Sequence, residues 1–229
     1  VPGTAMQCCE WWAFEILAIF AGMRGPHQLS AQVAVINIIG LLYMIPLGVQ
    51  FAAAALVGEQ FAMNNKRQAQ RFAGACIVWA LGLMSIIIIM LYTFEDWVAT
   101  LFTEDAEDIY YIKEVLKIVG LYLILDTIHG VQSGNVRGLG KQFIASIVTL
   151  LCYYALGLPI AIWMGFSKEM DLLGFWLGFL IAMIFLDAIV GYVVITAKWT
   201  LKEAKPGAQK EENLVLLTPE TKRRVNSVK

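Results

Sequence analysis

The 229-residue chain is 59% hydrophobic and only 15% charged. A soluble domain is about 45–50% apolar and about 25% charged, so this composition excludes an ordinary soluble protein and predicts an all-α membrane protein. The net charge of −1 gives no basic surface for nucleic acid. The chain begins at Val1 without a basic segment before the first apolar run, so we expect no signal peptide and expect a fragment of a longer protein.

Six apolar stretches are long enough to cross a bilayer, which takes roughly 20 residues in a helix. We therefore predict a six-helix transmembrane domain over residues 1–199. The charged remainder, 200–229, is predicted to be a disordered cytoplasmic tail. Pro46 in the second stretch predicts a kink, because proline removes a backbone donor. The stretches run over about 3–23, 29–58, 71–93, 111–135, 142–164 and 172–196.

Basic residues are unevenly divided between the two sides of this arrangement. Thirteen of the 17 Lys and Arg residues fall in the loops after the second and fourth stretches or in the tail. The opposite side carries the acidic segment 95–108. Because cytoplasmic loops are enriched in Lys and Arg, both termini are predicted to be cytoplasmic.

Four acidic residues lie near the middle of predicted spans: Glu10, Glu15, Asp126 and Asp187. No Lys or Arg falls at that depth. An ionised carboxylate in hydrocarbon needs a partner, so each acid must be protonated, face water, or meet a mobile cation. The four acids together favour a proton or cation pathway. The alternative is that each is a neutral hydrogen bonder that ties helices together.

Helix geometry separates the two acids of the first span. Five residues place Glu10 and Glu15 about 140° apart around the helix, so both cannot point into one cavity. Glu10 shares its face with Phe14 and Leu17, whereas Glu15 shares its face with Trp11, Trp12 and Ile19. Periodicity alone leaves open which face is wet.

Asp126 and His129 are three residues apart and lie on one face of the fourth span. Two ligands are too few for a metal, so we predict no metal site and expect a proton relay or a simple Asp–His hydrogen bond. Downstream, Gly130, Gly134 and Gly138 recur every four residues. That spacing predicts the close approach of another backbone.

Asn37 is a polar residue near mid-depth of the second span. Its amide has two open interpretations: a hydrogen bond to a substrate or carboxylate, or a bridge between helices. The sequence contains no phosphate-cradling loop, no nucleophile elbow and no zinc-protease motif. We therefore predict that the protein is not an enzyme and needs no cofactor.

Several segments together resemble the multidrug and toxic compound extrusion (MATE) transporters. The likeness is to the C-terminal six-helix lobe of the eukaryotic branch and covers about residues 3–199. The first and fourth of the segments are the most specific. The five segments are EWWAFE (10–15), YMIPLGVQFAAAALVG (43–58), GEQFAMNNKRQAQR (58–71), VRGLGKQ (136–142) and YYALGLP (153–159).

The resemblance implies one lobe of a twelve-helix antiporter that exports organic cations or metabolites in exchange for protons or sodium. The partners it implies are a missing N-terminal lobe and the lipid bilayer. Glu10 and Asp126 match the family's coupling acids, and Glu15 matches a common acid with a less settled role. We expect Trp11, Phe14, Asn37, Tyr43 and His129 to contact the substrate, the aromatic rings by apolar contact and cation–π attraction.

The chain departs from the family pattern in three places. Some animal members have an acid where this chain has Asn37. Val57 and Gly58 are not followed by the usual glycine-rich loop, and no family motif covers Asp187. Two other functions stay open. A lipid-linked sugar flippase would favour buried Lys and Arg, and the other alternative is a non-transporting scaffold or regulatory subunit. In the tail, Glu212, Leu216 and Leu217 fit a sorting pattern, so we expect the plasma membrane or an endosomal or vacuolar membrane.

Overall fold

The computed structural model describes the backbone of residues 2–197 and 199, and the side chains of residue 8 and of residue 10 onward within them. The predicted tail at 200–229 and its sorting pattern lie outside the described residues. Within residues 2–197 the fold is entirely helical. Its elements are α1 (Pro2–Arg24), α2 (Pro26–Ala62), α3 (Lys66–Thr93), α4 (Glu95–Thr100), α5 (Ala106–Gly138), α6 (Gln142–Leu150), η1 (Leu151–Gly157), α7 (Leu158–Ile162), η2 (Trp163–Ser167) and α8 (Asp171–Thr196).

Local sequence signals explain where the helices begin. The Asp105 carboxylate caps α5 by accepting hydrogen bonds from the backbone N–H groups of Glu107, at 2.8 Å, and Asp108, at 3.4 Å. Asn65 caps α3 by accepting from the N–H of Gln68. Gly25, with φ 155°, adopts backbone geometry that side chains disfavour, and lets the chain turn between α1 and α2.

The observed helices contain the predicted spans and extend a few residues beyond them. Helix α2 continues without a break through Pro46. The fifth span consists of α6, η1, α7 and η2 in succession, with two π-helical segments. Pro159 has no N–H to bond the carbonyl of Ala155, so the regular α-helical hydrogen bonding is interrupted there. The π-helix η1 ends at Gly157, two residues before this proline.

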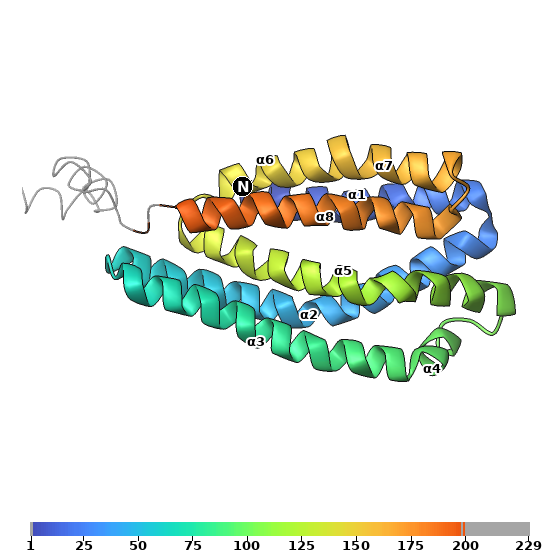
Figure 1. Cartoon of the computed structure of the whole chain (residues 1–229), viewed down its shortest axis with the longest axis horizontal. Helices are drawn as coiled ribbons and strands as arrows, with labels where there is room; N and C mark the ends of the chain where they lie inside the picture. Colours follow the sequence, from blue (N-terminus) through green and yellow to red (C-terminus); the bar gives the residue numbers. More distant parts are fainter. Residues whose placement is uncertain (1, 198, 200–229) are drawn as a thin grey trace, which may run out of the picture.

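Helix α5 lies at the centre of the bundle (Figure 1). It packs against α2 and α3 on one side and against α8 on the other. Helix α1 lies beside α8, and the α6–η2 segment packs against both. Side chains of α5 are therefore buried on both of its flanks, which places its polar residues inside the protein rather than on its surface.

The two ends of the bundle differ in charge. The α2–α3 and α5–α6 turns lie at the same end as the start of α1 and the end of α8 (Figure 1). Lys66, Arg67, Arg71 and Lys141 gather there. The acidic segment 95–108 lies at the other end. Arg24, Lys113, Lys117 and Lys168 fall on the acidic side, and most of the thirteen basic residues of the predicted division lie outside the described residues, so that division stays a prediction.

Four segments of the described chain are long and apolar enough to cross a membrane by length and composition. Helices α1 and α5 lie outside that group, and both contain buried acidic residues. Large apolar side chains are exposed on the outer face of α3, among them Trp79, Ile86 and Ile89. These features identify an integral membrane protein with an all-helical fold. The four segments are Pro26–Ala62, Lys66–Thr93, Gln142–Ser167 and Asp171–Thr196.

The glycines of α5 bring it close to α2, as the sequence predicted. A Cβ at Gly134 would lie 2.3 Å from the carbonyl oxygen of Gln50, and one at Gly138 would lie 2.9 Å from that of Ala54. Real Cβ atoms do not approach that closely. The predicted close approach of a second backbone is therefore confirmed, and its partner is α2.

A second close contact joins the η1–η2 part of the fifth span to α8 through a row of small residues on each side. This contact was not predicted. A Cβ at Gly178 would lie 2.4 Å from the backbone nitrogen of Ala161, and one at Gly174 would lie 2.7 Å from that of Gly165. Both rows have a spacing of four residues. The two backbones therefore pack with little side chain between them. The facing pairs are Gly165 with Gly174, Ala161 with Gly178, and Gly157 with Ala182.

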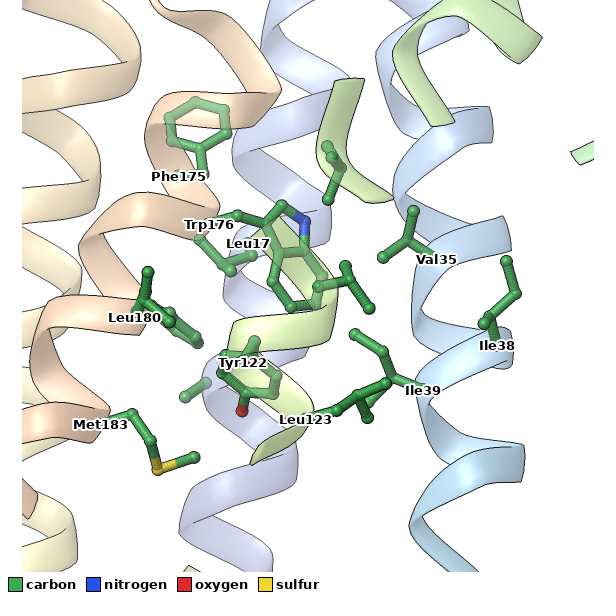
Figure 2. Packing of buried hydrophobic residues seen from close by; sticks show 14 of the residues in the cluster. Leu17, Val35, Ile38, Ile39, Tyr122, Leu123, Phe175, Trp176, Leu180 and Met183 are labelled. Atoms are coloured by element: carbon green, nitrogen blue, oxygen red, sulfur yellow. The ribbon is translucent and has the colours of Figure 1, made fainter. Parts of the chain in front are cut away.

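Large apolar side chains fill the space between α1, α2, α5 and α8. Leu17, Tyr122 and Trp176 meet there and are fully buried (Figure 2). The indole nitrogen of Trp176 donates a 2.8 Å hydrogen bond to Oε1 of the buried Gln32. This bond fixes the ring in an otherwise apolar core, because a buried N–H without a partner is costly.

Candidate functional site

A small pocket opens beside this core, where five elements meet. Its cavity volume is about 40 Å³. A water needs at least about 10–15 Å³, so the pocket has room for a few waters, whereas drug-sized ligands occupy roughly 300–1,000 Å³. Two acids, Glu10 and Asp126, are the charged groups in its lining. The lining residues are Glu10, Trp11, Phe14, Ile36, Ile39, Gly40, Tyr43, Tyr122, Asp126, Tyr153 and Trp176.

Helix α1 turns one of its two acids into the protein and the other outward. Glu10 is 8% exposed and borders the pocket, and Leu17 on the same face is fully buried. Glu15 is exposed, as is Ile19 beside it. The face shared by Glu10 and Phe14 is therefore the pocket face. Glu15 does not contribute to this pocket, and its coupling role stays a prediction.

Glu10 is the first of three ionisable side chains, from three helices, that form a buried row. Nε2 of His129 on α5 lies 3.1 Å from Oε1 of Glu10 on α1. Nδ1 of the same ring lies 3.6 Å from Oδ1 of Asp187 on α8. All three side chains are buried. The hydroxyl of Ser133 lies 3.4 Å from Nε2.

This row corrects two sequence-based expectations. Spacing suggested a relay or hydrogen bond between Asp126 and His129, but among the described residues the ring of His129 lies beside the polar groups of Glu10, Asp187 and Ser133. The acids were also expected to lack a fixed basic partner because no Lys or Arg lies at their depth, but the ring of His129 lies beside Glu10. An imidazole can carry that charge at neutral pH.

Asp126 lies in the same pocket but outside this row. It is 8% exposed and faces the pocket from α5. The pocket therefore has one acid supplied by α1 and another supplied by α5. Both carboxyl groups are withdrawn from bulk solvent. In such a site a carboxyl group must be protonated, contact water or pair with a cation.

Aromatic rings line the pocket together with these acids. The Phe14 ring centroid lies 5.9 Å from that of Trp176 and 6.2 Å from that of Tyr122. Tyr122 and Trp176 meet edge to face at 5.4 Å. Tyr122, Tyr153 and Trp176 also line the pocket. The sequence does not distinguish them, because aromatic residues in an apolar span are typical of packing as well as of binding.

The remaining predicted contact residues divide between the pocket and the outside. Trp11 and Tyr43 line the pocket, and Trp11 is 41% exposed at its edge. Tyr43 and Gln50 lie on the same face of α2, two turns apart, and 3.3 Å separates the Tyr43 hydroxyl from the side-chain amide of Gln50. Asn37 is exposed and donates a 2.8 Å hydrogen bond to the carbonyl of Val33 in its own helix. Its substrate contact stays a prediction.

A second ionisable cluster lies at the acidic end of the bundle. Nδ1 of His27 on α2 lies 2.7 Å from Oδ1 of Asp108 on α5. Ser30 donates to Oδ2 of the same carboxylate at 2.6 Å, and Thr103 donates at 3.2 Å. Ligand atoms of His27, Asp105 and Asp108 lie within 4.8 Å of one another, as a metal site requires. The hydrogen bond between His27 and Asp108 links α2 to α5.

The hydrogen bonds of this link shift the pKa values of both His27 and Asp108. The hydrogen bond to Asp108 raises the pKa of His27 above 6.5. Burial raises the pKa of Asp108, but hydrogen bonds from Ser30, His27 and Thr103 outweigh it, and the net pKa falls below 3.8. The imidazolium therefore stabilises the fold below about pH 6.5, and this contribution is lost as pH rises through the raised pKa. The Asp108 carboxylate stabilises the fold above about pH 4, and this contribution is lost as pH falls below that value.

We expect His27 to titrate above pH 6.5, and Asp108→Asn to return its pKa toward 6.5. Histidine NMR of the purified chain measures this directly, because the sequence contains only two histidines. Asp105→Asn is the matched control. That carboxylate lies 3.8 Å from Nδ1 of His27, so its removal should lower the pKa less. Equal shifts in the two variants would contradict the link.

Comparison with known proteins places this fold and pocket in a family. The family model MatE matches residues 2–163. The chain belongs to the MatE family. The resemblance read from the sequence motifs is thereby confirmed. The matched residues include the whole of α1, α2, α3 and α5, and hence Glu10, Asp126 and His129. Asp187 on α8 lies beyond the match.

The MatE-family chain is similar to multidrug and toxin extrusion proteins of vertebrates. It is 33% identical to multidrug and toxin extrusion protein 2 of Oryctolagus cuniculus, over 93% of this chain and 35% of the relative. It is 32% identical to the human protein 2, over 92% of this chain and 35% of the relative. The chain thus spans about a third of the length of these relatives.

Solved structures of the family share the fold. The eukaryotic MATE transporter AtDTX14 superposes with a TM-score of 0.81 at 28% identity, over 86% of this chain and 45% of that one. A MATE structure in the bent conformation gives a TM-score of 0.80 at 15% identity, over 93% of this chain and 48% of that one. The all-helical lobe seen in this chain is therefore a part of a larger architecture in both proteins.

Proposed function

We propose that this chain is one lobe of a secondary active antiporter that exports organic cations or metabolites in exchange for protons or sodium. One observation carries the proposal: the buried acids Glu10 of α1 and Asp126 of α5 border a single pocket. The family match supports a transporter rather than an enzyme. The names of the vertebrate relatives support small toxic compounds as the substrate class.

The two pocket acids provide the coupling. In a site withdrawn from water, an ionised carboxylate is stabilised either by a proton, which neutralises it, or by an arriving cation. Proton and cation therefore compete for the same negative charge. Binding of one favours release of the other, and this reciprocity is what an antiporter needs.

Aromatic contacts supply the affinity for flat cations. The face of a Trp or Tyr ring attracts a cation by about 0.5–2 kcal/mol. Trp11 and Phe14 border the pocket, with Tyr43 facing them from α2. A pocket of about 40 Å³ is too small for a multidrug substrate. We propose that a second lobe completes the substrate cavity, and that Glu15 and Asn37 face this lobe.

The charge distribution supports the predicted orientation. The basic turns at one end of the bundle fit a cytoplasmic side, and the acidic cluster at the other end fits an external or luminal side. Both termini would then be cytoplasmic. The plasma membrane and an endosomal or vacuolar membrane both fit this arrangement.

The flippase alternative is disfavoured by the charge of the pocket. A pyrophosphate-linked lipid carries negative charge and calls for Lys or Arg in the cavity. The charged groups that line the pocket in the described chain are Glu10 and Asp126. A non-transporting scaffold would have no use for two buried acids at one pocket. Its signature would be normal transport in the acid variants described in the Discussion.

The test is uptake of a fluorescent organic cation into vesicles that contain the complete transporter bearing this lobe. A pH gradient is imposed in one set and a sodium gradient in the other. We expect one gradient to drive uptake against the concentration of the dye. Uptake that follows neither gradient would contradict the antiporter.

The 229-residue chain by itself should not transport. It spans about a third of its relatives' length, and its pocket is too small for the substrate. Vesicles that contain only this purified chain should therefore show no gradient-driven uptake of the same dye, while the complete transporter provides the positive control. Clear uptake by the single lobe would overturn the two-lobe model.

A further inference from the structure

Asp187 is a buried acid that the proposed coupling mechanism does not use. It is 8% exposed and lies on α8, away from the lining of the pocket. Neither of its carboxylate oxygens has a hydrogen-bond partner within the described residues, and Nδ1 of His129 also lacks one. The 3.6 Å between Nδ1 and Oδ1 is just beyond hydrogen-bond range. A buried carboxyl group in this state is costly unless a proton or charge satisfies it.

The number of protons in the row explains this arrangement. Each of the two contacts, Glu10 to Nε2 and Nδ1 to Asp187, needs one proton between its heavy atoms. A neutral imidazole carries a single N–H and can satisfy only one of them. At the other contact, a ring lone pair would face a carboxylate. The row therefore has a place for one additional proton, taken from water and returned to it.

The position of His129 favours the ring as the carrier of that proton. Two carboxylates on opposite sides of an imidazole stabilise its charged form. Protonation of the ring satisfies both contacts at once, because both nitrogens then donate. The proton would link the pocket acid Glu10 to Asp187 across about the width of one imidazole ring.

We propose that Glu10, His129 and Asp187 form a triad that holds one exchangeable proton, and that Asp187 is a third coupling residue of the lobe. This rests on the proposed antiporter function and extends it from the two pocket acids to α8. Asp187 acts through His129, so its role is to position and stabilise the shared proton. The triad joins three helices, so its proton content affects how α1, α5 and α8 pack.

Four other titratable groups line the pocket beside the triad. They are Asp126 and Tyr122 on α5, Tyr43 on α2 and Tyr153 on η1. Tyrosine hydroxyls titrate near pH 10 and stay neutral in the physiological range. Proton exchange near neutral pH therefore involves the triad and Asp126.

Nitrogen-15 histidine NMR of the purified chain in lipid nanodiscs tests the triad directly. The sequence has two histidines, and a His27→Gln variant assigns their signals. At pH 7 we expect both ring nitrogens of His129 to be protonated in the wild type. In Asp187→Asn, the ring should become a neutral tautomer at the same pH. Unchanged His129 signals in this variant between pH 5 and 9 would overturn the proposal.

Two controls separate a lost proton from lost folding. Asp171→Asn makes the same chemical change on α8 but at its external end, where that residue pairs with Arg24, and should leave His129 charged. Asp187→Glu retains a carboxyl group and should keep the imidazolium. The His27 signal reports folding at the far end of the bundle. If Asp187→Asn alters it, Glu10→Gln replaces that variant and must neutralise His129 for the proposal to stand.

Transport by the complete protein provides a second readout. Asp187→Asn should lower uptake driven by a pH gradient at least about tenfold, within the usual range of coupling energies. Substrate exchange without a gradient should be retained. Parallel loss of both activities would assign Asp187 a purely structural role and overturn the proposal. Failure of the antiporter itself would appear differently, as uptake by the unmodified transporter that follows no ion gradient.

Discussion

Glu10→Gln is expected to abolish most of the pH-gradient-driven uptake by the complete transporter, with a loss of at least about tenfold. Glutamine has nearly the same shape as glutamate but cannot take up or release a proton. The change also removes the carboxylate that lies 3.1 Å from His129. Uptake of a fluorescent cation under an imposed gradient measures the effect, and Asp126→Asn should cause a similar loss.

Glu15→Gln provides the matched comparison within the same helix. The chemical change is identical, but Glu15 is exposed on the face of α1 turned away from the pocket. Its loss of uptake should be several-fold smaller than that of Glu10→Gln. Equal losses in the two variants would contradict the assignment of one helix face to coupling. Normal uptake in both Glu10→Gln and Asp126→Asn would return those acids to a role in packing.

Gly178→Val is expected to destabilise the lobe more than any surface substitution. A Cβ at this position would lie 2.4 Å from the backbone nitrogen of Ala161 and 2.5 Å from its Cα. Backbone atoms cannot rotate away as a side chain can, so α8 and α7 must separate. Overpacking of this kind costs about 1–3 kcal/mol or more. Thermal unfolding in detergent should shift down by at least about 5 °C.

Gly82→Val is the control for this substitution. Gly82 lies within the apolar helix α3, and a Cβ there has nothing within 4 Å. Its unfolding temperature should stay within about 1 °C of the unmodified chain, because a surface change away from close contacts has little effect. A similar decrease in both variants would show that valine destabilises these helices by itself. The close contact between α8 and α7 would then not explain the result.

Periodicity and composition predicted much of what the fold shows. The 140° separation of Glu10 and Glu15 follows from helical geometry, and α1 indeed buries one and exposes the other. The four-residue spacing of Gly130, Gly134 and Gly138 predicted a close helix contact, which α2 makes. These features depend on one helix at a time, so the local sequence contains the information.

Contacts between helices were harder to predict. Asp126 was the natural partner for His129, because the two are neighbours on one helix face. The rotation of α5 instead directs the imidazole between α1 and α8. Asp187 matched no motif, although its depth in an apolar span marked it as unusual. The row of Gly174, Gly178 and Ala182 was visible in the sequence, but nothing there identified its partner.

The sequence by itself determined the membrane class, the approximate extent of the helices, the family resemblance and the face of α1 that carries Glu10. Only the tertiary structure decided which of the buried acids meet. Glu10, His129 and Asp187 come from α1, α5 and α8, and their meeting depends on how far each helix is rotated and shifted against the others. The close glycine contacts that set those positions arise between segments, so no single helix encodes them.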